Sequence, residues 1–127
     1  MSATILLIED NEQNRYLVTF LLEQHGHKVV HAPDGPRAIE IAQTVRPDLI
    51  LLDIQLPMMD GYEVARALRG MVSLGDTPII AVTSFAMVGD REKALAAGCN
   101  GYIEKPINPE TFVAQIASFS APSPKAQ

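Results

Sequence analysis

Short apolar runs alternate along the chain with longer segments of helical periodicity. The runs are rich in Leu, Ile and Val and predict five strands, at residues 4–8, 28–32, 49–52, 79–82 and 101–103. Residues 49–52 read LILL, and such continuous apolar runs are typical of strands buried on both faces of a parallel sheet. We therefore predict an α/β fold, a five-stranded parallel sheet with helices on both sides.

The segments that follow the strands carry the start and stop signals of five helices. In the first, Leu17, Phe20 and Leu21 recur at helical spacing. The third and fourth helices are expected at residues 62–69 and about 89–97. Other boundaries come from residues that cap, open or end helices. These are Gly26, Pro36, Pro47, Gly98 and Asn108, the last expected to cap the final helix ahead of Pro109.

The length of 127 residues suits one hydrophobic core, and we expect one domain over residues 1–119. Residues 120–127 read SAPSPKAQ. Small, polar and proline-containing residues bury too little apolar surface to offset the entropy lost on ordering, so a flexible C-terminal tail is predicted there.

Charge and cysteine content exclude several classes of function. A net charge of −5 and an isoelectric point near 5.0 argue against direct contact with nucleic acid or anionic lipid. No apolar run approaches the length of a membrane span, and the N-terminus lacks the pattern of a secretory signal. The single cysteine, Cys99, cannot form an internal disulfide. These features predict a cytoplasmic protein without membrane insertion.

Reactive side chains follow four of the five predicted strands. Glu9 and Asp10 follow the first strand, Asp53 the third, Thr83 the fourth and Lys105 the fifth. In open parallel sheets the ligand site lies outside the carboxyl ends of the strands. Three carboxylates gathered there would repel one another unless a cation shared the site. Mg²⁺ suits such a site because it takes oxygen ligands, usually one or two carboxylates together with a phosphate.

These residues together are suited to phosphoryl transfer. Aspartate can act as a nucleophile that forms an acyl phosphate, and Asp53 follows the central strand. Lys105 and Thr83 would supply positive charge and a hydrogen-bond donor to the phosphoryl oxygens. Taken singly, each residue has an ordinary structural reading, such as a helix cap for Glu9 or a strand end for Asp53. Their coincidence at one edge of the sheet favours the chemical interpretation.

Four motifs now support a family resemblance: ILLIEDN, DLILLDIQLPMMDGYE, PIIAVTSFA and GYIEKPI. Over about residues 4–119 the chain resembles the receiver domains of bacterial two-component response regulators, the CheY-like family. It looks closest to DivK-type single-domain regulators. The resemblance implies a sheet in the strand order 2-1-3-4-5, flanked by five helices.

The resemblance also implies roles for individual residues. Asp53 would be the phosphoacceptor and Lys105 a catalytic partner preceding a cis Pro106. Thr83 and Tyr102 would move together as a switch upon phosphorylation. The implied Mg²⁺ ligands are Asp10, Asp53, Glu9 through the metal's water shell, and the backbone carbonyl of Gln55. Glu9 stands where the family often has aspartate.

The implied function is a single-domain response regulator in a phosphorelay. A histidine kinase or histidine phosphotransfer protein would donate the phosphoryl group, and the product would change affinity for a downstream protein. The chain would catalyse only its own phosphorylation and dephosphorylation. VTSFAM and GCNGYIEKPI also resemble receivers of hybrid histidine kinases, so an excised receiver is an alternative. A Mg²⁺-dependent aspartate-nucleophile phosphatase is a remote one, because Gln55 stands where a second acid is needed.

Other reactive residue types receive structural interpretations. The three histidines show no metal-ligand spacing, and a packed or solvated role is expected for each. The sulfur-containing residues near the motifs are expected to pack or to shape a loop rather than to bind metal. The residues concerned are His25, His27, His31, Met58, Met59 and Cys99.

Overall fold

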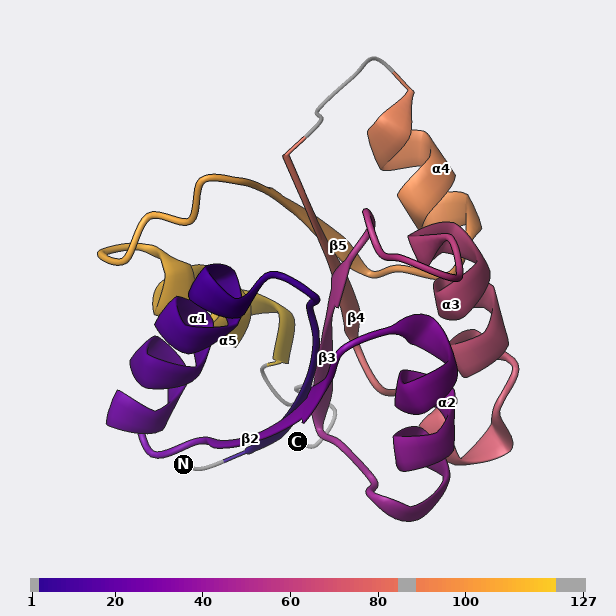
Figure 1. Cartoon of the computed structure of the whole chain (residues 1–127), viewed down its shortest axis with the longest axis horizontal. Coiled ribbons are helices and arrows are strands. Elements are labelled where there is room, and N and C mark those ends of the chain that lie inside the picture. Colours follow the sequence, from indigo (N-terminus) through magenta and orange to yellow (C-terminus); the bar gives the residue numbers. More distant parts are fainter. Residues whose placement is uncertain (1–2, 85–88, 121–127) are drawn as a thin grey trace.

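The computed structural model describes residues 3–84 and 89–120, and five strands in this part of the chain form one parallel sheet (Figure 1). The sheet order is β2-β1-β3-β4-β5, as predicted. The strands are β1 (Thr4–Ile8), β2 (Lys28–Ala32), β3 (Leu49–Asp53), β4 (Ile79–Thr83) and β5 (Gly101–Glu104). The last three run one residue further than predicted. Asp53 and Thr83 are therefore the final residues of their strands rather than the first residues of loops.

Helices cover both faces of the sheet (Figure 1), with α1 and α5 on one side and α2, α3 and α4 on the other. This arrangement confirms the predicted α/β fold. The helices are α1 (Glu12–Gln24), α2 (Gly35–Thr44), α3 (Gly61–Arg69), α4 (Asp90–Ala96) and α5 (Phe112–Ser120), with a short 3₁₀ helix η1 (Val72–Leu74).

The double covering explains the continuous apolar runs. Successive residues of a strand point to opposite faces. Leu6 and Ile8 accordingly pack in the cluster that includes residues of α2 to α4, whereas Ile5 and Leu7 pack in the cluster with residues of α1 and α5. Both faces therefore need apolar side chains.

The start of the last helix was predicted wrongly. Asn108 does not cap α5, which begins at Phe112. The Asn108 side chain instead accepts a hydrogen bond from the amide of Glu110 at 2.9 Å, and its carbonyl accepts one from the amide of Phe112 at 2.9 Å. Asn108 thus opens a turn that leads into the helix, because the asparagine side chain that caps helices also forms such turns. α5 reaches Ser120, and the rest of the predicted tail lies outside the described residues.

The loop after β3 is fixed by a close approach to the first residue of α3. The amide of Gly61 donates to the carbonyl of Ile54 at 3.1 Å. A Cβ atom on Gly61 would lie 2.5 Å from the Cα atom of Ile54 and 2.6 Å from its carbonyl oxygen. Only glycine fits this contact, which lies one residue beyond Asp53.

The Gly61 contact predicts a stability cost for an added methyl group. Gly61→Ala would push the backbone of residue 61 away from that of Ile54. We expect the free energy of unfolding to fall by about 2 kcal/mol, as for other overpacked sites. Gly70→Ala is the control, because its nearest neighbour would lie at 3.5 Å, and it should be neutral or slightly stabilising. Urea unfolding of both variants checks the prediction. Equal stability of the two would show that the loop yields without cost.

Candidate functional site

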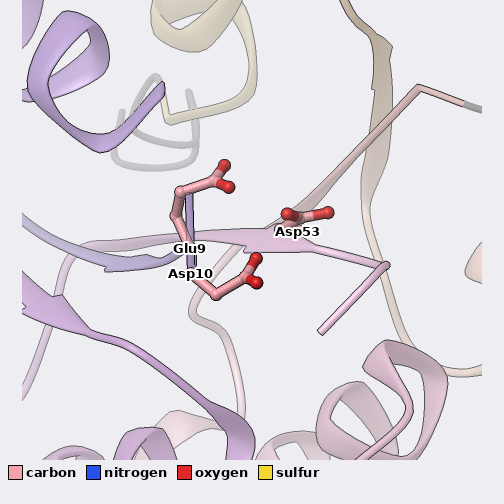
Figure 2. A group of neighbouring side chains, drawn as sticks. All are labelled: Glu9, Asp10 and Asp53. Carbon is pink, nitrogen blue, oxygen red and sulfur yellow. The ribbon is translucent and has the colours of Figure 1, made fainter. Parts of the chain in front are cut away.

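Three carboxylates meet at the carboxyl edge of the sheet. Glu9 and Asp10 follow β1, and Asp53 ends the neighbouring strand β3, so the pairing of Ile8 with Leu52 brings them together. One carboxylate oxygen from each lies within 4.8 Å of the others (Figure 2). Glu9 and Asp53 are buried, with 3% and 4% of their surface exposed, whereas Asp10 is exposed. We call Glu9, Asp10 and Asp53 the acidic cluster.

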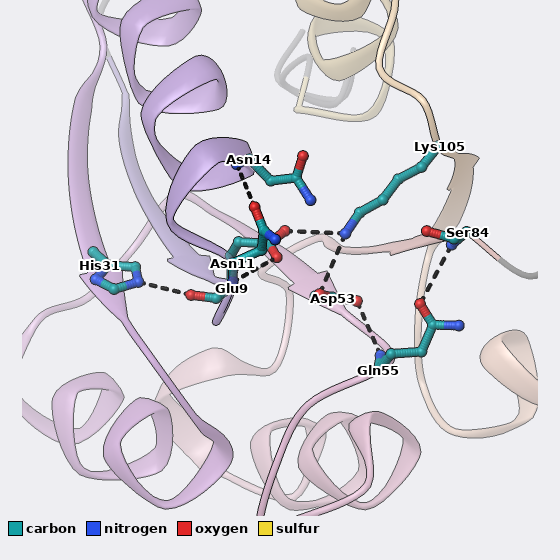
Figure 3. Close-up of polar contacts among 8 residues, drawn as sticks. All are labelled: Glu9, Asn11, Asn14, His31, Asp53, Gln55, Ser84 and Lys105. Atoms are coloured by element: carbon teal, nitrogen blue, oxygen red, sulfur yellow. Dashed lines mark hydrogen bonds and ion pairs between the residues drawn. The ribbon is translucent and has the colours of Figure 1, made fainter.

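The lysine that follows β5, the strand at one end of the sheet order, contacts two of these acids. The Nζ atom of Lys105 lies 3.3 Å from Oε1 of Glu9 and 3.3 Å from Oδ2 of Asp53 (Figure 3). Its side chain is largely buried, at 10% exposure. The amide of Lys105 donates to the carbonyl of Thr83 at 2.8 Å, which anchors the segment that follows β5. The Lys105–Pro106 bond is cis, as the family resemblance implied.

The cluster is poor in positive charge. Burial, and then the neighbouring Asp53 carboxyl, raise the pKa of Glu9 to about 7. Lys105 and the amide of Asn11 favour the charged form of Glu9 but do not outweigh these effects. One ammonium group therefore does not compensate the two buried carboxylates. A hard divalent cation fits this site, since the cluster offers only carboxylate oxygen donors.

The Asp53 carboxylate is held at both oxygens. Oδ1 accepts a hydrogen bond from the amide of Gln55 at 2.9 Å, and Oδ2 contacts Lys105. The Gln55 side chain reaches the residue that follows β4, where its Oε1 accepts from the amide of Ser84 at 3.5 Å. The role of the Gln55 carbonyl as a metal ligand stays a prediction.

The two residues expected to form a switch lie on adjacent strands. Thr83 ends β4 and is buried, with 3% exposure, and it pairs in register with Glu104 of β5. Tyr102 lies two residues before Glu104, is half-buried, and packs against the core cluster on the side of α2 to α4. The structure therefore connects the site edge to this face through β4 and β5. Their coupled movement remains a prediction.

Two of the residues set aside as structural behave as expected. Cys99 is buried, which raises the pKa of its thiol to about 11 and keeps it protonated. The ring of His27 accepts a hydrogen bond from the amide of Ala3 at 3.1 Å, away from the site.

His31 is a contact that sequence reasoning missed. Its Nε2 atom lies 2.8 Å from the carbonyl oxygen of Glu9. The available signal was a polar residue near the end of a strand predicted to pair with the strand that carries the acids.

Within residues 3–84 and 89–120, none of the helices has the length and hydrophobicity that a membrane span requires.

Comparisons with known proteins agree with this geometry. The family described as response regulator receiver domain matches residues 5–117. The chain is 42% identical to the polar-differentiation response regulator DivK of Brucella anthropi over 119 residues, which cover 94% of this chain and 97% of the relative. DivK of Brucella ovis is 41% identical over the same shares of the two chains.

Solved structures give the same result. Chemotaxis response regulator CheY4 of Vibrio cholerae matches with a TM-score of 0.89 and 31% identity, over 94% of this chain and 99% of the other. The receiver domain of sensor histidine kinase PA1611 from Pseudomonas aeruginosa, with a magnesium ion coordinated in the active site cleft, matches with a TM-score of 0.87 and 35% identity, over 96% and 100%. Sheet order, strand-edge acids and sequence similarity thus converge, and the chain belongs to the response regulator receiver domain family of two-component signalling.

Proposed function

We propose that Asp53 accepts a phosphoryl group from the phosphohistidine of a histidine kinase or histidine phosphotransfer protein. The observation that carries the proposal is the buried Asp53 carboxylate, held 3.3 Å from the ammonium of Lys105 inside the acidic cluster. In the transfer, a carboxylate oxygen bonds to phosphorus while the phosphorus–nitrogen bond breaks, and the electron pair leaves with the imidazole. Lys105 stabilises the negative charge on the phosphoryl oxygens. The chain catalyses only its own phosphorylation and dephosphorylation.

The metal in this proposal is Mg²⁺. Asp10 and Asp53 would hold it directly, with the backbone carbonyl of Gln55, and Glu9 through water. Bound Mg²⁺ supplies positive charge that the transition state needs. The oxygen donors, the raised pKa of Glu9 and the magnesium ion in the PA1611 receiver support this assignment.

The output of the switch is a changed surface. In our proposal the Thr83 hydroxyl donates to the new phosphoryl group, and the ring of Tyr102 follows it inward, so that a downstream protein binds differently. The position of Thr83 beside Asp53 at the strand edge supports its part, since Asp53 pairs with the preceding residue, Val82.

We further propose that the chain acts as a stand-alone cytoplasmic regulator. The DivK relatives support this reading, because the aligned region covers 97% of their length. A receiver within a hybrid histidine kinase is the second candidate, supported by the match to the PA1611 receiver. The stand-alone reading would be favoured if the phosphorylated protein bound separate kinase and target proteins. The hybrid-kinase reading would be favoured if it bound a kinase segment of its own chain.

Phosphorylation of Asp53 predicts a single mass change. Wild-type protein incubated with acetyl phosphate and Mg²⁺ should gain one phosphoryl group by intact-protein mass spectrometry, and chelator should prevent it. Asp53→Asn should gain none, because the amide cannot act as the nucleophile. Asp76→Asn is the matched control, since Asp76 is exposed in the segment before β4, at the opposite edge of the sheet, and should be phosphorylated normally. Modification of Asp53→Asn would contradict the assignment.

The raised pKa of Glu9 predicts that Mg²⁺ binding strengthens with pH. Near pH 6 Glu9 is mostly protonated, and Mg²⁺ must displace this proton, so affinity should be about tenfold weaker than near pH 8. In the metal-free protein, folding stability is expected to fall, rather than rise, with increasing pH. The folded state holds the proton more tightly than the unfolded state, so Glu9 contributes stability that is lost as pH rises through about 7.

Both effects can be measured with one control. Isothermal titration gives the Mg²⁺ affinity, and urea unfolding in chelator gives the stability of the metal-free protein. Glu9→Gln should flatten both pH profiles, because the amide does not titrate. Unchanged profiles in this variant would assign the pH dependence to another group.

The proposed switch predicts that phosphorylation and its structural response can be separated. Thr83→Ala should still accept the phosphoryl group on Asp53, although more slowly, because it loses one hydrogen-bond donor. NMR signals of the Tyr102 ring should shift on phosphorylation of the wild type and stay unchanged in Thr83→Ala. A full Tyr102 response in the variant would show that Thr83 does not transmit the change.

A further inference from the structure

One side chain from outside the acidic cluster contacts the cluster's backbone. Figure 3 shows His31 of β2 pointing at Glu9, with its Nε2 atom 2.8 Å from the Glu9 carbonyl oxygen. A carbonyl oxygen only accepts hydrogen bonds. The hydrogen must therefore lie on Nε2, and the ring donates it to Glu9.

This bond stands where the backbone ladder between β1 and β2 stops. The two strands pair in parallel as far as Ile8 with Ala32, and the amide of Glu9 donates to the carbonyl of Ala32 at 3.1 Å. Continued in register, the Glu9 carbonyl would next accept from the amide of Asp34. Asp34 is instead the N-cap of α2, where the chain leaves the sheet. Among the described residues, the His31 ring supplies the hydrogen bond to the Glu9 carbonyl that the Asp34 amide would otherwise make.

The position of the Glu9 carbonyl affects the orientation of two side chains of the acidic cluster. It belongs to the peptide unit that joins Glu9 to Asp10, and this unit is planar, with the two Cα atoms at its ends. Both Cα atoms carry a carboxylate of the cluster. A hydrogen bond that fixes the carbonyl oxygen therefore limits rotation of the plane from which both side chains extend. The preceding peptide unit, which joins Ile8 to Glu9, is held through the amide of Glu9, which donates to the carbonyl of Ala32.

We propose that His31 is a positioning residue for the acidic cluster, which presets the Glu9–Asp10 peptide through its Nε2–H bond and so raises the affinity of the site for Mg²⁺. This inference rests on the proposed function, in which these acids bind the metal. Hydrogen bonds outside the ligands of a metal site orient those ligands, and their removal typically weakens metal binding by roughly 10- to 100-fold.

A purely structural role for His31 makes a different prediction. If the ring only secured the end of the β1–β2 pair, its loss would lower stability and leave metal affinity unchanged. His27 is a matched control. Its ring also forms a hydrogen bond with the backbone, accepting from the amide of Ala3, the residue before β1. This contact lies at the end of β2 that is farther from the site. His27→Leu removes a comparable bond without touching the acidic cluster.

The test compares His31→Leu, His31→Gln and His27→Leu with the wild type. Mg²⁺ affinity is measured by NMR titration of the amide signals of residues 9–11 near pH 8, and stability by urea unfolding. We expect His31→Leu to bind Mg²⁺ about tenfold more weakly. His31→Gln should restore binding close to wild type, because its amide N–H can donate to the same carbonyl. His27→Leu should be less stable but bind Mg²⁺ normally.

The outcomes separate this inference from the proposed function. Equal affinities of wild type and His31→Leu would overturn the role of His31 while metal binding by the cluster stands. A wild type that binds no Mg²⁺ would overturn both. If His31→Leu does not fold, long-range ¹H–¹⁵N spectra of the wild type decide, since a neutral ring with its proton on Nδ1 contradicts the proposed bond and one with its proton on Nε2 supports it.

Discussion

One lysine ammonium shared between two buried carboxylates is the interaction on which the site depends. Glu9 and Asp53 come from segments more than forty residues apart, and the parallel sheet brings them to one edge. Lys105 lies 3.3 Å from both. Burial, and then the neighbouring Asp53, raise the pKa of Glu9 although Lys105 opposes them, so a single positive charge does not compensate the two buried carboxylates. This shortage of positive charge makes the edge of the sheet a favourable site for a divalent cation.

The fold protects this arrangement by covering the sheet on both faces. Glu9 and Asp53 are buried at the strand ends, so their charges interact more strongly than they would in water. Close packing then fixes the loop after Asp53, where Gly61 lies against Ile54. The amide of Gln55 orients one oxygen of Asp53 while Lys105 contacts the other. Rigid elements therefore hold both oxygens of the Asp53 carboxylate in fixed directions.

The strands that form the site also lead away from it. β4 ends at Thr83, beside Asp53, and β5 carries Tyr102 two residues before the partner of Thr83. Adjacent strands thus connect the edge of the sheet to the half-buried ring of Tyr102, as the proposed switch requires. At the opposite end of the strand order, β2 contributes His31, whose ring contacts the carbonyl of the Glu9–Asp10 peptide. The site draws on the whole width of the sheet.

The amino-acid sequence was enough to predict the five strands and the acids, threonine and lysine at their ends, because these depend on local periodicity and on which residue follows each strand. The sheet order came from the family resemblance. It placed the start of α5 wrongly, since an asparagine opens a turn as readily as it caps a helix. The raised pKa of Glu9 and its contact with His31, 22 residues away, became visible only in the assembled fold. Burial and the register of neighbouring strands arise when the whole sheet assembles, and no local pattern encodes them.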